Sequence, residues 1–117
     1  MQTLTVSIPE KAVTIGSHIG LADSFLSRLC GLLGKSSLDP GSGILIRPSS
    51  GVHTLGMRFP IDVVALDKNL RVVKLWRRLR PYRITSVSLR TQSVLELAPG
   101  QIDACRIERG DRLALSN

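Results

Sequence analysis

The 117-residue sequence predicts a mostly antiparallel β domain, a sandwich or flattened barrel, with one short helix. Most apolar residues fall in short runs that alternate or are rich in β-branched side chains. Clusters of Gly, Pro, Ser and Asp separate these runs. The length fits one domain spanning residues 1–117. Aromatic residues make up only 3%, so the core must be aliphatic.

The first strand is expected over residues 3–8, where TLTVSI alternates and Pro9 ends the run. A second strand is expected over 11–22, with Gly16 and Gly20 marking irregular points. The one convincing helix covers about 22–33. Asp23 or Ser24 can serve as its N-cap, because a short side-chain oxygen can accept from an unpaired backbone amide.

The rest of the chain predicts further strands. They are expected at Ile44–Arg47, Ile61–Leu66, 71–77, Ser93–Ala98, 104–108 and 111–116. The runs IDVVAL and RVVKLWR flank the polar turn DKNL, which predicts a hairpin in which Asn69 takes the left-handed conformation. Gly110 is expected in the last turn.

Two of these strands each carry a single acid. Alternation places Asp62 with Val64 and Leu66, and Glu96 with Val94 and Ala98. A carboxylate in an apolar strand must be hydrogen-bonded, paired or neutral. We favour a structural anchor that accepts backbone amides or pairs with an arginine. The alternative is a carboxylate pair for acid–base catalysis, with His53 as partner.

A segment with several polar residues precedes Asp62 in the sequence. His53, Thr54 and Arg58 are expected to donate hydrogen bonds to a small polar or anionic ligand, and Met57 to line its pocket. Together with Asp62 and Glu96 they form the predicted ligand site. We predict no metal site, since neither histidine has a ligand cluster, and no cofactor. Walker and GxSxG motifs are absent, and no catalytic residue is assigned.

The segment KLWRRLRPYR is the most basic part of the chain. It contains Lys74, Trp76, Arg77, Arg78, Arg80, Tyr82 and Arg83. Arginines neutralise phosphates and aromatic rings stack on bases, so the segment is a candidate nucleic-acid surface. We favour the alternative that positive charge protects a solvated edge strand from aggregation.

The net charge of +7 favours weak attraction to nucleic acid or anionic surfaces. We see neither a signal peptide nor an apolar run long enough to span a membrane, so a soluble cytoplasmic protein is expected. Cys30 and Cys105 are interpreted as buried thiols, with a disulfide left open.

An ordered set of motifs resembles the DUF192 (UPF0127) family. The set comprises RLCGLLG, GILI, MRFPIDVVALD followed by RVV, VLELAPG and RGD, over roughly Ala22 to Leu115. The resemblance implies a compact, jelly-roll-like β-sandwich with a short helix, and no established activity.

The segment VHTLGMRFPID departs from the family's common Trp-Met-Lys-Asn-Thr-like form and resembles a VHTxGMRxPID subgroup. His53 replaces the Trp, so a ligand site here would differ. Leu70 replaces a turn glycine, which is why the turn is expected to depend on Asn69. The sequence therefore predicts a non-enzymatic binding or accessory module. A hydrolase or lyase, and a nucleic-acid binder, are the alternatives.

Overall fold

The computed structural model describes residues 2–24, 32, 35–51, 57–83 and 88–117. Its elements are β1 (Thr3–Ile8), the 3-10 helix η1 (Pro9–Lys11), β2 (Val13–Ala22), β3 (Ser42–Ile46), β4 (Ile61–Leu66), β5 (Val72–Leu79), β6 (Ser93–Leu97), α2 (Gln101–Ala104) and β7 (Ala114–Ser116). Within these ranges no helix is long and apolar enough to cross a membrane.

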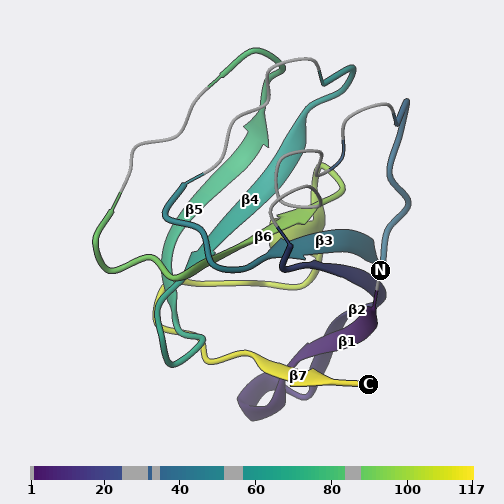
Figure 1. Ribbon diagram of the computed structural model, residues 1–117. Helices are drawn as coiled ribbons and strands as arrows, with labels where there is room; N and C mark the ends of the chain where they lie inside the picture. Colours follow the sequence, from purple (N-terminus) through teal and green to yellow (C-terminus); the bar gives the residue numbers. More distant parts are fainter. Residues whose placement is uncertain (1, 25–31, 33–34, 52–56, 84–87) are drawn as a thin grey trace.

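The strands form one curled sheet in the order β5-β4-β6-β3-β2-β1-β7 (Figure 1). β2 and β3 run parallel, and the other neighbouring pairs are antiparallel. The curl brings the two ends of the sheet together. A β-bridge joins Arg71 to Arg112, and the backbone amide of Val72 donates a hydrogen bond to the backbone carbonyl of Asp111. The predicted mainly β fold of the flattened-barrel type is confirmed.

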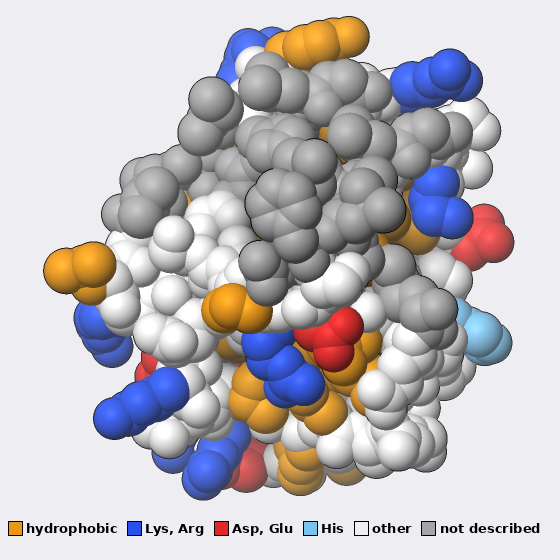
Figure 2. Space-filling model, viewed as in Figure 1, with side chains coloured by type: hydrophobic (Ala, Val, Ile, Leu, Met, Phe, Trp, Pro, Cys, Tyr) orange, Lys and Arg blue, Asp and Glu red, His pale blue; other side chains and the backbone are white. Residues whose placement is uncertain are grey.

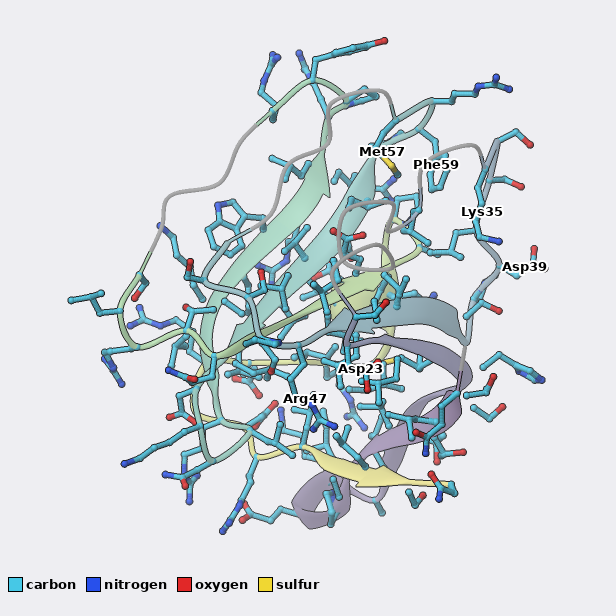
Figure 3. All side chains as sticks on the ribbon, viewed as in Figure 1. Asp23, Lys35, Asp39, Arg47, Met57 and Phe59 are labelled. Carbon is cyan, nitrogen blue, oxygen red and sulfur yellow. The ribbon has the colours of Figure 1, made fainter. Side chains whose placement is uncertain are left out.

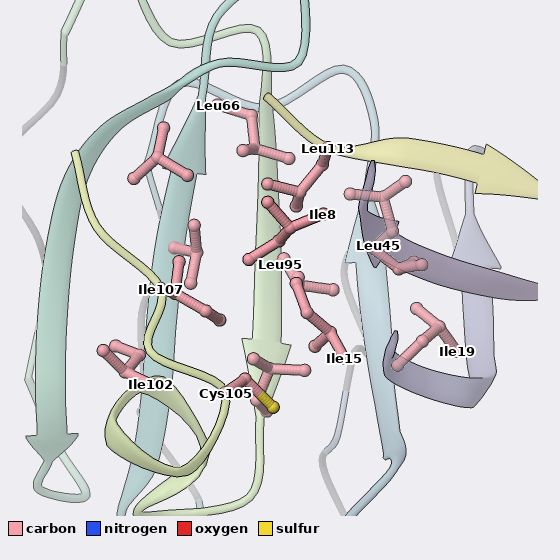
Figure 4. Packing of buried hydrophobic residues seen from close by; sticks show 14 of the residues in the cluster. Ile8, Ile15, Ile19, Leu45, Leu66, Leu95, Ile102, Cys105, Ile107 and Leu113 are labelled. Atoms are coloured by element: carbon pink, nitrogen blue, oxygen red, sulfur yellow. The ribbon is translucent and has the colours of Figure 1, made fainter. Parts of the chain in front are cut away.

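The larger hydrophobic core, called the inner core, fills the inside of the curl (Figure 4). It joins Val6 and Ile8 of β1 to Val64 of β4, although these strands lie far apart in the sheet order. Residues 102–113 contribute the side chains of Ile102, Ile107 and Leu113, and so cover the open side. Cys105 is a buried free thiol at its edge, while Cys30 lies outside the described residues.

A second cluster, the outer core, covers the other face of the central strands. Its buried members are Ala22, Leu32, Ile44, Ile46, Met57, Ile61, Val63 and Val94. Leu38, Phe59, Trp76 and Leu79 pack against it and are half-buried. Because both faces of β4 and β6 are covered, every residue of these two strands is buried.

Three expectations about the elements need correction or fall outside the described residues. The helix over about 22–33 lies mostly outside them, and Ala22 instead ends β2. The strand over 104–108 is wrong, because Ala104 ends the short helix α2 (Gln101–Ala104) and residues 105–108 form a turn and irregular backbone. Gly100 adopts a left-handed φ of 93° and starts this helical turn just after Pro99. The last strand is shorter than expected and begins at Ala114.

The β4–β5 hairpin is confirmed, but its left-handed residue is Leu70 (φ 62°) and not Asn69. The amide of Leu70 donates to the Asp67 carbonyl, which closes a tight turn. Oδ1 of Asp67 accepts from the amides of Asn69 and Arg71 and holds the turn from inside. Leu70 also packs against the inner core, which offsets a left-handed cost of about 1–2 kcal/mol.

Candidate functional site

Asp62 is fully buried on β4 and accepts three backbone hydrogen bonds. Its Oδ1 accepts from the amide of Arg78 at 2.9 Å, and its Oδ2 from the amides of Gly100 and Ile102 at 3.1 and 2.8 Å. A carboxylate with several amide donors is well compensated for burial. Both carboxylate oxygens of Asp62 are thus hydrogen-bonded to backbone amides.

The three amides belong to irregular backbone. Two residues of β5, Arg77 and Arg78, lie opposite the single residue Asp62, which makes a bulge in which Arg78 has a φ of 51°. Gly100 and Ile102 belong to the start of α2. Asp62 therefore joins β4 to the bulge and to the helical turn, as expected of a structural anchor that accepts backbone amides.

Glu96 lies at the centre of the other face of the sheet. Its cross-strand partners are Val63 of β4 and Ile44 of β3, which continue to Trp76 of β5 and Gly20 of β2. Residues paired across neighbouring strands share a face. These five residues therefore form one row across five strands, and Glu96 is the ionisable residue in that row. The side chain is 3% exposed, and none of the described residues donates a hydrogen bond to its carboxyl group.

Burial raises the pKa of Glu96 to about 8. The surrounding side chains are apolar, which penalises the charged form. Glu96 therefore carries a proton at neutral pH for most of the time. A protonated carboxyl can both donate and accept a hydrogen bond, whereas Asp62 serves only as an acceptor from amides.

The two acids do not form a catalytic pair. Asp62 is paired with Leu97, and Glu96 with the next residue of β4, Val63. Neighbouring residues of a strand point to opposite faces. Asp62 therefore faces the inner core and Glu96 the outer core, with the sheet between them.

The other predicted ligand residues that the structure describes, Met57 and Arg58, differ in burial. Met57 is buried in the outer core beside half-buried Phe59, near the start of β4 (Figure 3). Arg58, between them, is exposed. His53 and Thr54 lie outside the described residues. The structure thus brings Met57 to the same face as Glu96 and places Asp62 on the other face.

The basic segment follows the edge strand β5 and the turn after it. Arg77 pairs with Asp103 of α2 at 2.8 Å on the inner side of the sheet. Lys74 lies over the ring of Trp76, 5.0 Å from its centroid, on the outer side. Tyr82, Arg80 and Arg83 are exposed beyond the strand. The side chains therefore point in several directions and do not form one flat surface.

Trp76 belongs to the candidate site around Glu96, although the sequence alone placed it in the candidate nucleic-acid surface. Its ring packs against the outer core in the same row as Glu96. The signal that could have found it is alternation along β5, but a bulge at Arg77–Arg78 and a second register shift near Leu66 interrupt that strand's pairing. The face of Trp76 could not be assigned without knowing the bulge.

The sequence model of DUF192, described as an uncharacterized ACR, matches residues 6–115. The chain belongs to the DUF192 family. Two UPF0127 proteins are similar to it, from Pyrococcus horikoshii and Pyrococcus furiosus, each 33% identical. The first match spans 82% of this chain and 85% of the relative, and the second 88% and 90%.

The DUF192 fold is also seen in a crystal structure from Novosphingobium aromaticivorans, a protein of unknown function. It superimposes with a TM-score of 0.81 over 96% of this chain and 83% of the other, at 19% identity. This likeness supports the fold. Neither the family nor these relatives carry an established activity, so any function must be argued from this chain's own residues.

Proposed function

We propose that this DUF192 chain is a small, non-enzymatic binding module whose ligand lies over Glu96 on the outer face of the sheet. One observation carries the proposal: the Glu96 carboxyl is buried at the centre of an apolar face, where burial raises its pKa to about 8, and it has no hydrogen bond to another described residue. Buried polar groups without partners are rare and costly. The expected cytoplasmic location belongs to the same proposal.

The chemistry of the face defines the ligand. A protonated carboxyl offers one donor and one acceptor, which matches an amide, a hydroxyl or another carboxylic group. Leaving it unpaired costs about 1–3 kcal/mol, and a ligand that pairs with it recovers this energy. Trp76, Met57 and Phe59 supply apolar walls, as small-molecule sites commonly do. Arg58, His53 and Thr54 are the proposed donors to a polar or anionic end of the ligand.

A thermal-shift screen of small amides, hydroxy acids and carboxylic acids tests this proposal. A ligand that binds only the folded chain raises its Tm. Glu96→Gln, which keeps the shape but fixes the donor and acceptor, is expected to weaken or lose the shift. Glu10→Gln removes an exposed carboxylate and should leave the shift intact. Ligand shifts that are equal in all three proteins would place the ligand elsewhere.

An enzyme remains the second candidate, with Glu96 alone as general acid. The raised pKa favours it, because a general acid must hold its proton near neutral pH. Asp62 has no part in this mechanism, since three amides engage it on the opposite face. Hydrolase or lyase turnover that falls as pH rises through about 8, and is lost in Glu96→Gln, would replace the binding-module proposal.

Nucleic-acid binding through residues 74–83 is the weaker alternative. The edge position of β5 and the exposed Tyr82 favour it, while the contacts of Arg77 and Trp76 count against it. Binding to single-stranded RNA should fall steeply with salt if it is real. The triple variant R77A/R78A/R80A should then abolish it. No binding at low salt would dismiss this alternative.

A further inference from the structure

Three arginines from separate segments line one open hollow beside the β4–β5 turn. Arg71 follows that turn, Arg90 precedes β6, and Arg109 lies between α2 and β7. The hollow has a volume of about 390 Å³. Lys and Arg side chains gather at the lower left of the view in Figure 2, where Figure 1 places the turn.

The charges in the hollow are unbalanced. Asp67 is the one carboxylate among the described residues that line the hollow, and its Oδ1 already accepts hydrogen bonds from two turn amides. Burial acts to raise the pKa of Asp67, but those amides and the nearby guanidinium groups of Arg90 and Arg71 together lower it. Asp67 therefore keeps its negative charge, and three guanidinium groups against one carboxylate leave an excess of two positive charges.

Two of the three guanidinium groups are available to a ligand. Arg71 donates through Nη1 to the carbonyl of Gly110 at 3.1 Å, which fixes its position at the rim. Arg90 and Arg109 are exposed and have no ion pair or side-chain hydrogen bond in the part of the chain that the structure describes. Both guanidinium groups can therefore form hydrogen bonds to a ligand, and Arg90 also lies near enough to Asp67 to lower the pKa of that carboxyl.

We propose that this hollow binds the phosphate group of a small phosphorylated molecule. A phosphate monoester carries about −1.5 to −2 charges at neutral pH, which matches the excess of positive charge. The guanidinium fork can bind two phosphate oxygens at once. At roughly 30 Å³ for each water, the hollow holds about a dozen waters, so an organic group fits beside the phosphate.

A neighbouring hollow provides a place for that organic group. It has a volume of about 270 Å³, shares Asp67 and Arg90 with the first, and adds Lys68 and Leu89. Leu89 is 98% exposed and offers an apolar contact. Arg90 stands between the two hollows, so it can hold the phosphate while the rest of the molecule extends toward Leu89.

Titration calorimetry with the full chain at low ionic strength tests the proposal, with glycerol phosphate, inorganic phosphate and succinate as probes. The double variant Arg90→Gln/Arg109→Gln should weaken phosphate binding at least tenfold. The matched control, Arg47→Gln/Arg106→Gln, removes the same charge from exposed positions outside the hollow and should change binding less than twofold. Circular dichroism melting confirms that each variant folds.

The three probes separate the chemistry. Glycerol phosphate binding more tightly than inorganic phosphate supports an organic group in the neighbouring hollow. Equal or tighter binding of succinate would overturn the preference for phosphate, and equal losses in the two double variants would reduce the effect to net charge. A short RNA that binds through these arginines when glycerol phosphate does not would overturn the ligand class. Glu96→Gln should leave phosphate binding unchanged, so this proposal stands or falls independently of the outer-face site.

Discussion

Asp62 and Glu96 sit on adjacent central strands, one register position apart, and face opposite sides of the sheet. Leu97 and Val63 are their respective cross-strand partners. The offset gives the two acids different environments. Asp62 accepts hydrogen bonds from three backbone amides, whereas Glu96 lies among apolar side chains and has no side-chain hydrogen bond to another described residue. One acid is therefore structural, and the other is the centre of the proposed ligand site.

Stability should fall as pH rises from about 4.5 to about 8. The folded chain holds the Glu96 proton up to a pKa of about 8, while the unfolded chain releases it near the ordinary value of 4.5. The stabilisation linked to this proton is complete below pH 4.5 and is lost through the folded pKa. The loss amounts to at most about 5 kcal/mol at 1.36 kcal/mol for each pH unit. Urea unfolding at several pH values measures it.

The Glu96→Gln variant should remove that pH dependence. Its free energy of unfolding is expected to exceed that of the wild type above pH 8, because the neutral amide never ionises in the apolar face. Glu10→Gln, at an exposed site, should keep the wild-type slope. Parallel slopes for the wild type and Glu96→Gln would contradict a raised pKa for this carboxyl.

Asp62→Asn should destabilise the chain by about 2–4 kcal/mol. The amide group of Asn offers one acceptor oxygen where three backbone donors converge, and its NH₂ group faces a backbone amide. Chemical denaturation gives the change in free energy. Asp39→Asn, at an exposed position, is the matched control. A loss below about 0.5 kcal/mol would refute the anchoring role.

Gly43→Ala should strain the contact between β3 and β6. An added Cβ would lie 2.4 Å from the carbonyl oxygen of Glu96 and 3.1 Å from Cδ2 of Leu97, so the two strands must move apart. The expected cost is about 1–3 kcal/mol in thermal or chemical unfolding. Ser42→Ala, one residue away, should cost far less, and similar losses in both would argue against a steric cause.

The ion pair between Arg77 and Asp103 should contribute little to stability. Its side chains are 52% and 72% exposed, so water and salt screen the attraction. A double-mutant cycle with Arg77→Gln and Asp103→Asn should give a coupling of about 0.2–1 kcal/mol that declines in 1 M salt. A coupling of several kcal/mol that persists in salt would show that α2 depends on this pair.

The sequence by itself predicted which residues share a face within each central strand. In β4, Asp62 goes with Val64 and Leu66, and the observed register agrees. The positions of several strands could also be predicted, because Pro9 and the polar DKNL turn interrupt the apolar runs. These features depend only on local alternation and turn chemistry, which act over a few residues.

Relations between strands depended on the tertiary structure. A shift of one residue between β4 and β6 would move Asp62 to the face of Glu96, and no local pattern encodes that register. Likewise, the three amides around Asp62 and the arginines at positions 71, 90 and 109 converge from distant segments. The sequence thus determined that two acids lie in apolar strands. Strand register and the curl of the sheet decided which of them accepts backbone amides and which is buried among apolar side chains.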